Sequence, residues 1–295
     1  IHLRLNARSK SDVSPAGDGV ADGSQRNKIM PEPPSTIRNV HVLVIGVGNY
    51  RHRSVPDLDY AERDARETYE FLTGSRSVAA PRNVHLLAGE ANEDGLEPTK
   101  AGISRAIEKY LIREAVHDDD MVLLFFAGHG DRGKSGDAYY FVPADGDPSS
   151  PLATCIERGE LERMMDRIPA RTRVVVADTC HSGVISGTRD LRIKGVSKME
   201  ATSKDKCTIA IVSCSPGERA VALKDKEQGL FTDVMLEGLE GKADSACGNR
   251  DERVTLGELG RWLKLRVPTA ARKVGGEQNP VANVPEGWEE VYLTR

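Results

Sequence analysis

The sequence predicts an α/β fold with a mostly parallel central sheet and helices on both faces of that sheet. The first observation is that apolar runs of strand length alternate with helical patterns from about residue 40 onward. The second is that a run such as VHVLVIGVG at 40–48 is almost continuously apolar, which is typical of a fully buried strand. Strands separated by helices of this length imply parallel pairing.

The expected elements follow from these patterns in chain order. Apolar and small side chains in 58–73 recur at a helical period, and Thr99 is suited to cap the next helix because its hydroxyl accepts a bond from the first turn. The expected strands are 40–48, 83–89, 120–130, 173–183, 207–215 and a closing strand at 289–295, with a hairpin or edge strand at 137–145. The expected helices are 58–73, 99–116, 159–168, 228–240 and 255–267.

Composition divides the chain into four segments. Residues 1–38 are rich in Ser, Asp, Gly and Pro without an apolar period, which predicts a disordered N-terminal tail or a propeptide. Residues 39–183 form the large part of the domain, and 207–295 form a smaller C-terminal part that completes the same domain. Between them, 184–206 are polar and basic, which predicts a long exposed loop. Loops of this length in a compact domain are usually functional or disordered.

Charge and cysteine content exclude several classes of function. The formal charge of −4 leaves no basic stripe to neutralise phosphates, so nucleic acid is not an expected partner. No window approaches the roughly 20 apolar residues that span a bilayer, so no membrane association is expected. The five cysteines are an odd number without CxxC spacing. This pattern argues against a disulfide framework or a zinc knuckle, and it favours a reducing, cytoplasmic location.

Two of the predicted strands end in reactive side chains. MVLLFFAGHG delivers His129 between two glycines, and RVVVADTCHSG delivers Cys180. Ligand sites of open parallel sheets lie beyond the carboxyl ends of the strands, so both residues are expected in one crevice. A cysteine nucleophile needs a thiolate, which a nearby imidazole can generate. The backbone N–H groups of Gly130 and Cys180 are suited to form an oxyanion hole, because glycine lets a carbonyl oxygen approach closely.

Residues 38–295 resemble the caspase-like cysteine peptidases (peptidase family C14), and within them the metacaspase and prokaryotic orthocaspase group. The resemblance rests on VLVIGVGNY, LDYAERDA, FFAGHG, DTCHSG and GLFTDVMLEGL. It implies the caspase-like fold, with His129 and Cys180 as the catalytic dyad of an endopeptidase that acts on protein substrates without a cofactor. Family members commonly carry Ser where Ala127 stands, so one polar contact of the substrate pocket is absent here.

The expected substrate preference is for cleavage after Arg or Lys. On an extended strand Asp178 shares its side with Cys180, whereas His181 faces away. A carboxylate beside the nucleophile repels an acidic substrate residue and pairs with a basic one. The resemblance implies that Asp178 and Asp64, the latter in LDYAERDA, line the pocket for that basic residue.

The loop 184–206 is expected to act as a cleavage switch. It offers basic residues of the type that the pocket accepts, and relatives are often processed in the matching segment, by themselves or by an upstream protease. The candidate positions are Arg189, Arg192, Lys194, Lys198, Lys204 and Lys206.

Three alternatives stay open at this point. In the first alternative, the chain is a catalytically silent scaffold or regulator. In the second, it is a switch that binds a nucleotide through Gly46 and Gly48. In the third, calcium stimulates the peptidase through carboxylates, although these lack a recognisable loop spacing, and no metal site is expected. The carboxylates concerned are Asp118, Asp119, Asp120, Asp137, Asp145 and Asp147.

Overall fold

The computed structural model describes residues 36–113, 116–132, 138–181, 206–215 and 217–295, with only the backbone of Arg132, Cys180 and His181. The main sheet has the strand order β10-β7-β6-β3-β1-β2, and β4 and β5 extend it from β3. These strands are β1 (Val40–Gly46), β2 (Val84–Ala88), β3 (Met121–Arg132), β4 (Tyr139–Phe141), β5 (Ile156–Glu157), β6 (Thr172–His181), β7 (Cys207–Val212) and β10 (Val281–Ala282).

Five neighbouring strands of this sheet run parallel. β1 pairs in parallel with β2 and β3, β3 with β6, and β6 with β7. The antiparallel additions are β10 at one edge, and β4 and β5 beyond the carboxyl end of β1. Every residue of β1 and of β7 is buried, as expected for strands covered on both faces. The predicted fold class is therefore confirmed.

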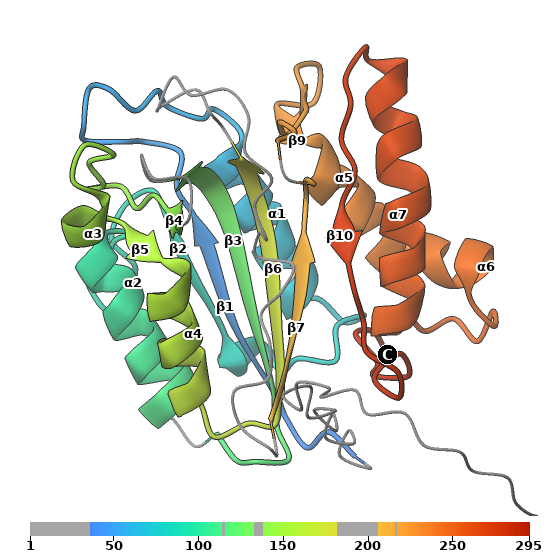
Figure 1. Cartoon of the computed structure of the whole chain (residues 1–295). Helices are drawn as coiled ribbons and strands as arrows, with labels where there is room; N and C mark the ends of the chain where they lie inside the picture. Colours follow the sequence, from blue (N-terminus) through green and yellow to red (C-terminus); the bar gives the residue numbers. More distant parts are fainter. Residues whose placement is uncertain (1–35, 114–115, 133–137, 182–205, 216) are drawn as a thin grey trace, which may run out of the picture.

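Helices cover both faces of the sheet (Figure 1). On one face α2 (Lys100–Ala106), its continuation η2 (Ile107–Arg113) and α4 (Arg158–Arg167) pack on residues such as Leu43 and Val175. On the other face α1 (Ala61–Thr73), α5 (Leu230–Glu237) and α7 (Leu256–Lys273) pack on residues such as Val42 and Val176. The core under α1, α5 and α7, called the second core below, contains residues that precede the 184–206 loop in the chain and residues that follow it. The two predicted parts therefore share one hydrophobic core.

Local capping signals explain where two helices begin. The Thr99 hydroxyl accepts a hydrogen bond from Gly102 N at 3.1 Å, as the sequence predicted. Thr255 and Glu258 form a reciprocal capping box at the start of α7. Minor elements that the sequence did not indicate are η1 (Pro81–Asn83), α3 (Pro151–Thr154), β8 (Ala222–Leu223), β9 (Gln228–Gly229), η4 (Gly238–Lys242) and α6 (Ala243–Cys247).

Two predictions at the C-terminus are wrong. Residues 289–295 do not form a strand of the sheet, because their backbone bonds to the loops before α7 and after α1, for example Leu293 N to Val254 O at 2.7 Å and Arg295 N to Arg76 O at 2.7 Å. The edge place is taken by β10 instead. The last helix also continues past 267 through Pro268 to Lys273, which buries Ala271 against the core.

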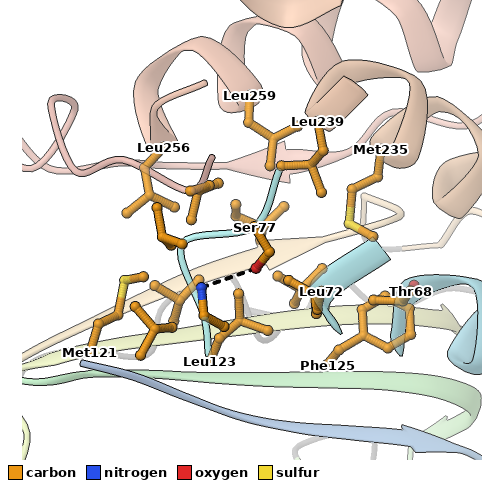
Figure 2. A pocket seen from close by; sticks show the side chains of 17 residues that line it. Thr68, Leu72, Ser77, Met121, Leu123, Phe125, Met235, Leu239, Leu256 and Leu259 are labelled. Atoms are coloured by element: carbon orange, nitrogen blue, oxygen red, sulfur yellow. Dashed lines mark hydrogen bonds between the residues drawn. The ribbon is translucent and has the colours of Figure 1, made fainter. Parts of the chain in front are cut away.

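A small cavity of about 30 Å³ lies in the second core, between the sheet and α1, α5 and α7. Figure 2 shows that its lining is apolar except for Thr68 and Ser77, and the Ser77 hydroxyl accepts a hydrogen bond from Ala79 N at 3.1 Å. On β6 it reaches Val174 and Val176 but not the carboxyl end of the strand. The cavity is therefore part of the core rather than a place for substrate.

The described residues locate only part of the predicted tail and loop. Residues 1–35 of the tail and 182–205 of the loop lie outside them. Arg38 N already bonds to Asp119 O at 3.0 Å, so the folded domain begins within the segment assigned to the tail. Within the described ranges, no helix is both long and apolar enough to cross a bilayer.

Candidate active site

The register of the sheet brings His129 and Cys180 together. β3 and β6 run past the end of β1, and in this extension the Cα atoms of the two residues are direct partners across the parallel ladder. Neighbouring strands lie about 4.8 Å apart, so the two backbones are adjacent. Both positions lie beyond the carboxyl end of β1, where an open parallel sheet places its ligands.

The His129 ring is held from both ends of one loop. Its Nε2 lies 2.8 Å from the carbonyl oxygen of Pro56, so Nε2 carries the proton and donates it. The Tyr50 ring packs on the His129 ring with centroids 4.9 Å apart, and the Tyr50 hydroxyl accepts a hydrogen bond from His129 N at 2.8 Å. The other ring nitrogen, Nδ1, is buried and has no hydrogen-bond partner among the described residues. This nitrogen is the one available to act as a base.

The loop that holds the ring is fixed by its own hydrogen bonds. Tyr50 N donates to the Asp57 carboxylate at 2.8 Å, and Leu58 N donates to Gly48 O at 2.8 Å. The Tyr50 hydroxyl also donates to Val47 O at 3.0 Å. The sequence around Tyr50 and Pro56 did not indicate a role for either residue. The available signal was the position of Tyr50 at the end of VLVIGVGNY, directly after the first strand.

Burial lowers the pKa of His129. The Pro56 carbonyl and the Asp57 carboxylate oppose this shift, but burial of the ring has the largest effect. The imidazole is therefore neutral at about pH 7, since its ordinary pKa is already about 6.5. A neutral ring with the proton on Nε2 leaves Nδ1 ready to accept a proton.

Asp64 and Asp178 come together around Gly229, although they lie on α1 and β6. A Cβ atom at Gly229 would be 2.6 Å from Asp64 Oδ2 and 3.0 Å from Asp178 Oδ2. Gly229 N donates to both oxygens of Asp64, at 3.0 and 3.2 Å. Asp178 accepts hydrogen bonds from the Thr232 hydroxyl at 2.8 Å and from Ser213. The structure thus brings together the two carboxylates that the resemblance assigned to one pocket.

Both carboxylates are buried, and this raises the pKa of each. Asp64 is 0% exposed and Asp178 is 5% exposed. Burial, followed by the repulsion of Asp178, raises the pKa of Asp64 to about 8. Burial also raises the pKa of Asp178, against the hydrogen bonds from Thr232 and Ser213. No Lys or Arg of the described segments forms an ion pair with either of them.

Two further candidate residues lie in the same part of the sheet. Ala127 is buried and is the Cα partner of Asp178, so the position beside the carboxylate pair carries a methyl group rather than a hydroxyl. Gly130 lies within the ladder, opposite Phe141 on β4 and His181 on β6. Its role as an oxyanion donor stays a prediction.

The glycines considered for nucleotide binding have packing roles. A Cβ at Gly46 would be 2.5 Å from Ala65 Cβ, so this glycine allows α1 to pack closely on β1. A Cβ at Gly48 would be 2.9 Å from Glu62 Cγ, and the Glu62 carboxylate lies near it. A negative charge at this place is opposite to what a phosphate needs.

Most of the acidic residues considered for calcium have local partners. Asp118 pairs with Arg171 at 2.7 Å, Asp120 accepts from Asn39 N at 3.0 Å, and Asp145 accepts from Lys100 N at 2.8 Å. Asp147 accepts from Ser149, and Asp137 lies outside the described residues. In the described part of the chain, no three His, Cys, Asp or Glu side chains gather as metal ligands would.

Only one of the six basic loop positions can be located. Arg189, Arg192, Lys194, Lys198 and Lys204 lie outside the described residues. The Lys206 ammonium donates to Asp166 O at 2.9 Å and to Ile168 O at 2.6 Å, at the end of α4. Lys206 is therefore anchored to the domain by these two hydrogen bonds.

Burial distinguishes two of the remaining cysteines from a nucleophile. Cys155 and Cys207 are fully buried, and burial raises the pKa of each thiol to about 11. A thiol with such a pKa carries almost no thiolate at neutral pH. Cys214 is also buried, and Cys247 is half-buried.

Comparisons with known proteins point in one direction. The model of the caspase domain family, Peptidase_C14, matches residues 39–284. A probable protease of a Desulfuromonadales bacterium is 26% identical over 227 residues, which are 72% of this chain and 27% of that protein. Metacaspase-4 of Arabidopsis thaliana is 25% identical over 151 residues, which are 48% of this chain and 34% of that protein. The matched segments thus span about a third or less of both relatives.

Solved structures show the same fold. A protein of Geobacter sulfurreducens matches with a TM-score of 0.55 and 15% identity, covering 86% of this chain and 97% of that one. Caspase-1 of Spodoptera frugiperda matches with a TM-score of 0.53 and 13% identity, covering 90% of this chain and 93% of that one.

Proposed function

Because the chain belongs to the caspase domain family, we propose that it is a cysteine endopeptidase that cleaves protein substrates after Arg or Lys. The observation that carries the proposal is the arrangement of His129. Its Nε2 is fixed to the Pro56 carbonyl, its Nδ1 has no described partner, and its Cα lies opposite that of Cys180. This is what a general base beside a cysteine nucleophile requires.

The proposed chemistry uses these two residues in turn. His129 Nδ1 accepts the proton of the Cys180 thiol, and the thiolate attacks the carbonyl carbon of the peptide bond. When the C–N bond breaks, the imidazolium returns the proton to the leaving amine, and an acyl-enzyme thioester remains. Water then hydrolyses the thioester with the same base, which regenerates the thiol. We assign the oxyanion to the backbone N–H groups of Gly130 and Cys180, because a glycine lets a carbonyl oxygen approach closely.

The preference for Arg or Lys rests on the pair Asp64 and Asp178. Two buried carboxylates that lack an ion pair with a described Lys or Arg favour a cation and repel an acidic side chain. A guanidinium can bind a carboxylate through two parallel hydrogen bonds, which adds geometric specificity. Gly229 supports this assignment, because a side chain there would fill the space between the two carboxylates.

An open pocket of about 710 Å³ lies between the loop that holds His129 and the hairpin of β8 and β9. Asp57 of the loop and Gln228, next to Gly229, both line it. Its other charged lining residues are Asp59, Glu62, Lys224 and Glu227, so acidic groups predominate. The pocket offers room for a peptide beside the loop that holds His129, in surroundings that favour basic segments.

Cleavage of the loop 184–206 is proposed as the activating event. The chain leaves β6 after His181, one residue beyond Cys180, at the carboxyl edge of the sheet. It enters β7 at the opposite edge, since Thr172 pairs with Cys207. β6 and β7 remain paired through six residues each, so the two halves of a cut chain are expected to stay associated. The proposed cutting agent is the protein itself or an upstream protease that recognises a basic residue of the loop.

Covalent labelling tests the proposed function. The protein is treated with a peptidyl acyloxymethyl ketone that carries Arg at the reactive position, and in parallel with the same reagent carrying Asp. The expected result is one label on Cys180 from the Arg reagent only, found by peptide mass analysis. The control variant Cys155→Ala should be labelled on Cys180 in the same way. Faster labelling by the Asp reagent would contradict the specificity. Absence of any label on Cys180 in intact and in loop-cut protein would favour a catalytically silent scaffold.

A further inference from the structure

We propose that the pair Asp64 and Asp178 holds one proton in the free protein and releases it to solvent when a cationic side chain enters the pocket. Binding of Arg or Lys is then an exchange of one positive charge for another, and it becomes stronger as the pH rises. This inference rests on the proposed function, because it concerns the pocket assigned there to the basic residue.

If both carboxyl groups were ionised, two negative charges would share one small buried volume. The position that a Cβ atom would take at Gly229 lies 2.6 Å from Asp64 Oδ2 and 3.0 Å from Asp178 Oδ2. Burial makes the charged form of each carboxyl group unfavourable, and each charge raises the free energy of the other. Two carboxylates that share a site ionise with one pKa strongly raised, so a single proton is held between them.

The nearby cations are engaged with other acids. On α1 the Arg63 guanidinium pairs with Glu67 at 2.8 Å and with Glu227 at 3.6 Å. On the segment between β8 and α5, Lys226 pairs with Asp233 at 2.7 Å. Each of these basic side chains is nearly half exposed, so it contributes little to a buried site.

The remaining elements around the pair supply neutral groups and one further acid. This acid is Glu67, which accepts a hydrogen bond from the Gln228 amide and repels a negative charge on Asp64. β7 contributes the Ser213 hydroxyl and α5 the Thr232 hydroxyl, and both donate to Asp178. β3 contributes the Ala127 methyl group, and His129 two residues further is neutral because burial lowers its pKa. Within the described residues, a proton is therefore the charge that balances the pair in the free protein.

Entry of a guanidinium changes this balance. An opposite charge within about 4–6 Å lowers the pKa of a carboxyl group by 1–3 units. Because the pKa of Asp64 is raised to about 8 in the free protein, this lowering brings the pKa to about 7 or below. The carboxyl group then releases up to one proton to the buffer at neutral pH. By linkage, affinity for the cation then rises with pH, by at most tenfold per unit, until the free pair is ionised.

Calorimetry on the full chain tests the exchange. The probe is an acetylated peptide that ends in Arg, and the protein carries Cys180→Ala so that no thiol proton takes part. Binding is measured at about pH 7 in phosphate and in Tris, whose ionisation enthalpies differ. The expected result is a difference in binding enthalpy that corresponds to release of between half a proton and one proton per peptide, with affinity rising severalfold from about pH 6 to pH 7.

Two variants and one peptide make the result specific. Asp64→Asn in the same background is expected to lose the proton release, whereas Asp233→Asn keeps it, because Asp233 pairs with Lys226. A peptide with neutral citrulline in place of Arg is expected to bind at least tenfold more weakly. Tight binding of the Arg peptide with equal enthalpies in both buffers would overturn the proton exchange but leave the proposed function intact. Equal binding of the Arg and citrulline peptides would contradict the proposed function itself.

Discussion

Replacing Asp64 by Asn should make the free protein more stable at alkaline pH while it strongly lowers the turnover of Arg substrates. The side chain is completely buried, and it shares its surroundings with Asp178. Asn keeps the size of the group and an oxygen that can accept the bond from Gly229 N, but it cannot ionise. The substitution therefore removes a buried charge with little change of packing.

The magnitude follows from the raised pKa of Asp64. The carboxyl group has an ordinary pKa of about 3.9 in the unfolded chain. In the folded protein burial and Asp178 raise this pKa to about 8. Between these values the folded state holds more protons than the unfolded state, so its stability falls as the pH rises. The slope is about 1.4 kcal/mol per pH unit. From pH 5 to 8 the parent protein should therefore lose on the order of 4 kcal/mol that the Asn variant keeps.

Urea unfolding followed by circular dichroism, at pH 5 and at pH 8, measures this difference. Asp233→Asn is the matched control, because it removes a partly exposed acid of the same region. Turnover of an Arg substrate by Asp64→Asn should fall on the order of a hundredfold, since the cation loses one of its two partners. If the parent and Asp64→Asn lose the same stability as the pH rises, the pKa of Asp64 is not raised in the folded protein.

Three further predictions concern other parts of the site. Tyr50→Phe removes the hydroxyl that accepts from the backbone N–H of the base, so kcat should fall about tenfold and the pH profile of kcat should shift, with KM unchanged; an unchanged profile would contradict a positioning role. Gly229→Ala places a methyl group against the pocket carboxylates, so KM for an Arg substrate should rise at least tenfold, whereas Gly159→Ala, with 3.5 Å to its nearest neighbour, should have no effect. Cys155→Ala and Cys207→Ala should retain most activity, and neither thiol should react with iodoacetamide at neutral pH in the folded protein, because burial raises the pKa of both to about 11.

The sequence predicts the parallel sheet and its reactive end well, because these depend on local patterns. A continuously apolar run such as 40–46 has to be buried on both faces, and the residues that follow such runs have to lie at the carboxyl edge. The opposition of His129 and Cys180 follows from two neighbouring strands in register. The prediction of a closing strand was wrong because the alternation in EEVYLTR is compatible with any half-buried extended segment. Contacts with two loops determine where this segment lies.

The supporting residues of the site depend on contacts between distant parts of the chain. Nothing local in Pro56 indicates that its carbonyl accepts the hydrogen bond of His129, since the bond joins positions 73 residues apart. Gly229 also gives no local signal, because its importance comes from carboxylates on α1 and β6. Asp64 became identifiable only through the resemblance, as an aspartate on a helix is otherwise an ordinary surface residue.

The most direct measurement of the central claim is the mapping of cleavage positions. The full chain, with its loop intact or cut by a trypsin-like protease that is then inhibited, is incubated with a diverse peptide library, and the products are sequenced by mass spectrometry. We expect cuts after Arg and Lys by the parent protein and none by Cys180→Ala or His129→Ala, with unchanged folding of both variants. Cuts that persist in Cys180→Ala, or that follow Asp in preference to Arg, would contradict it.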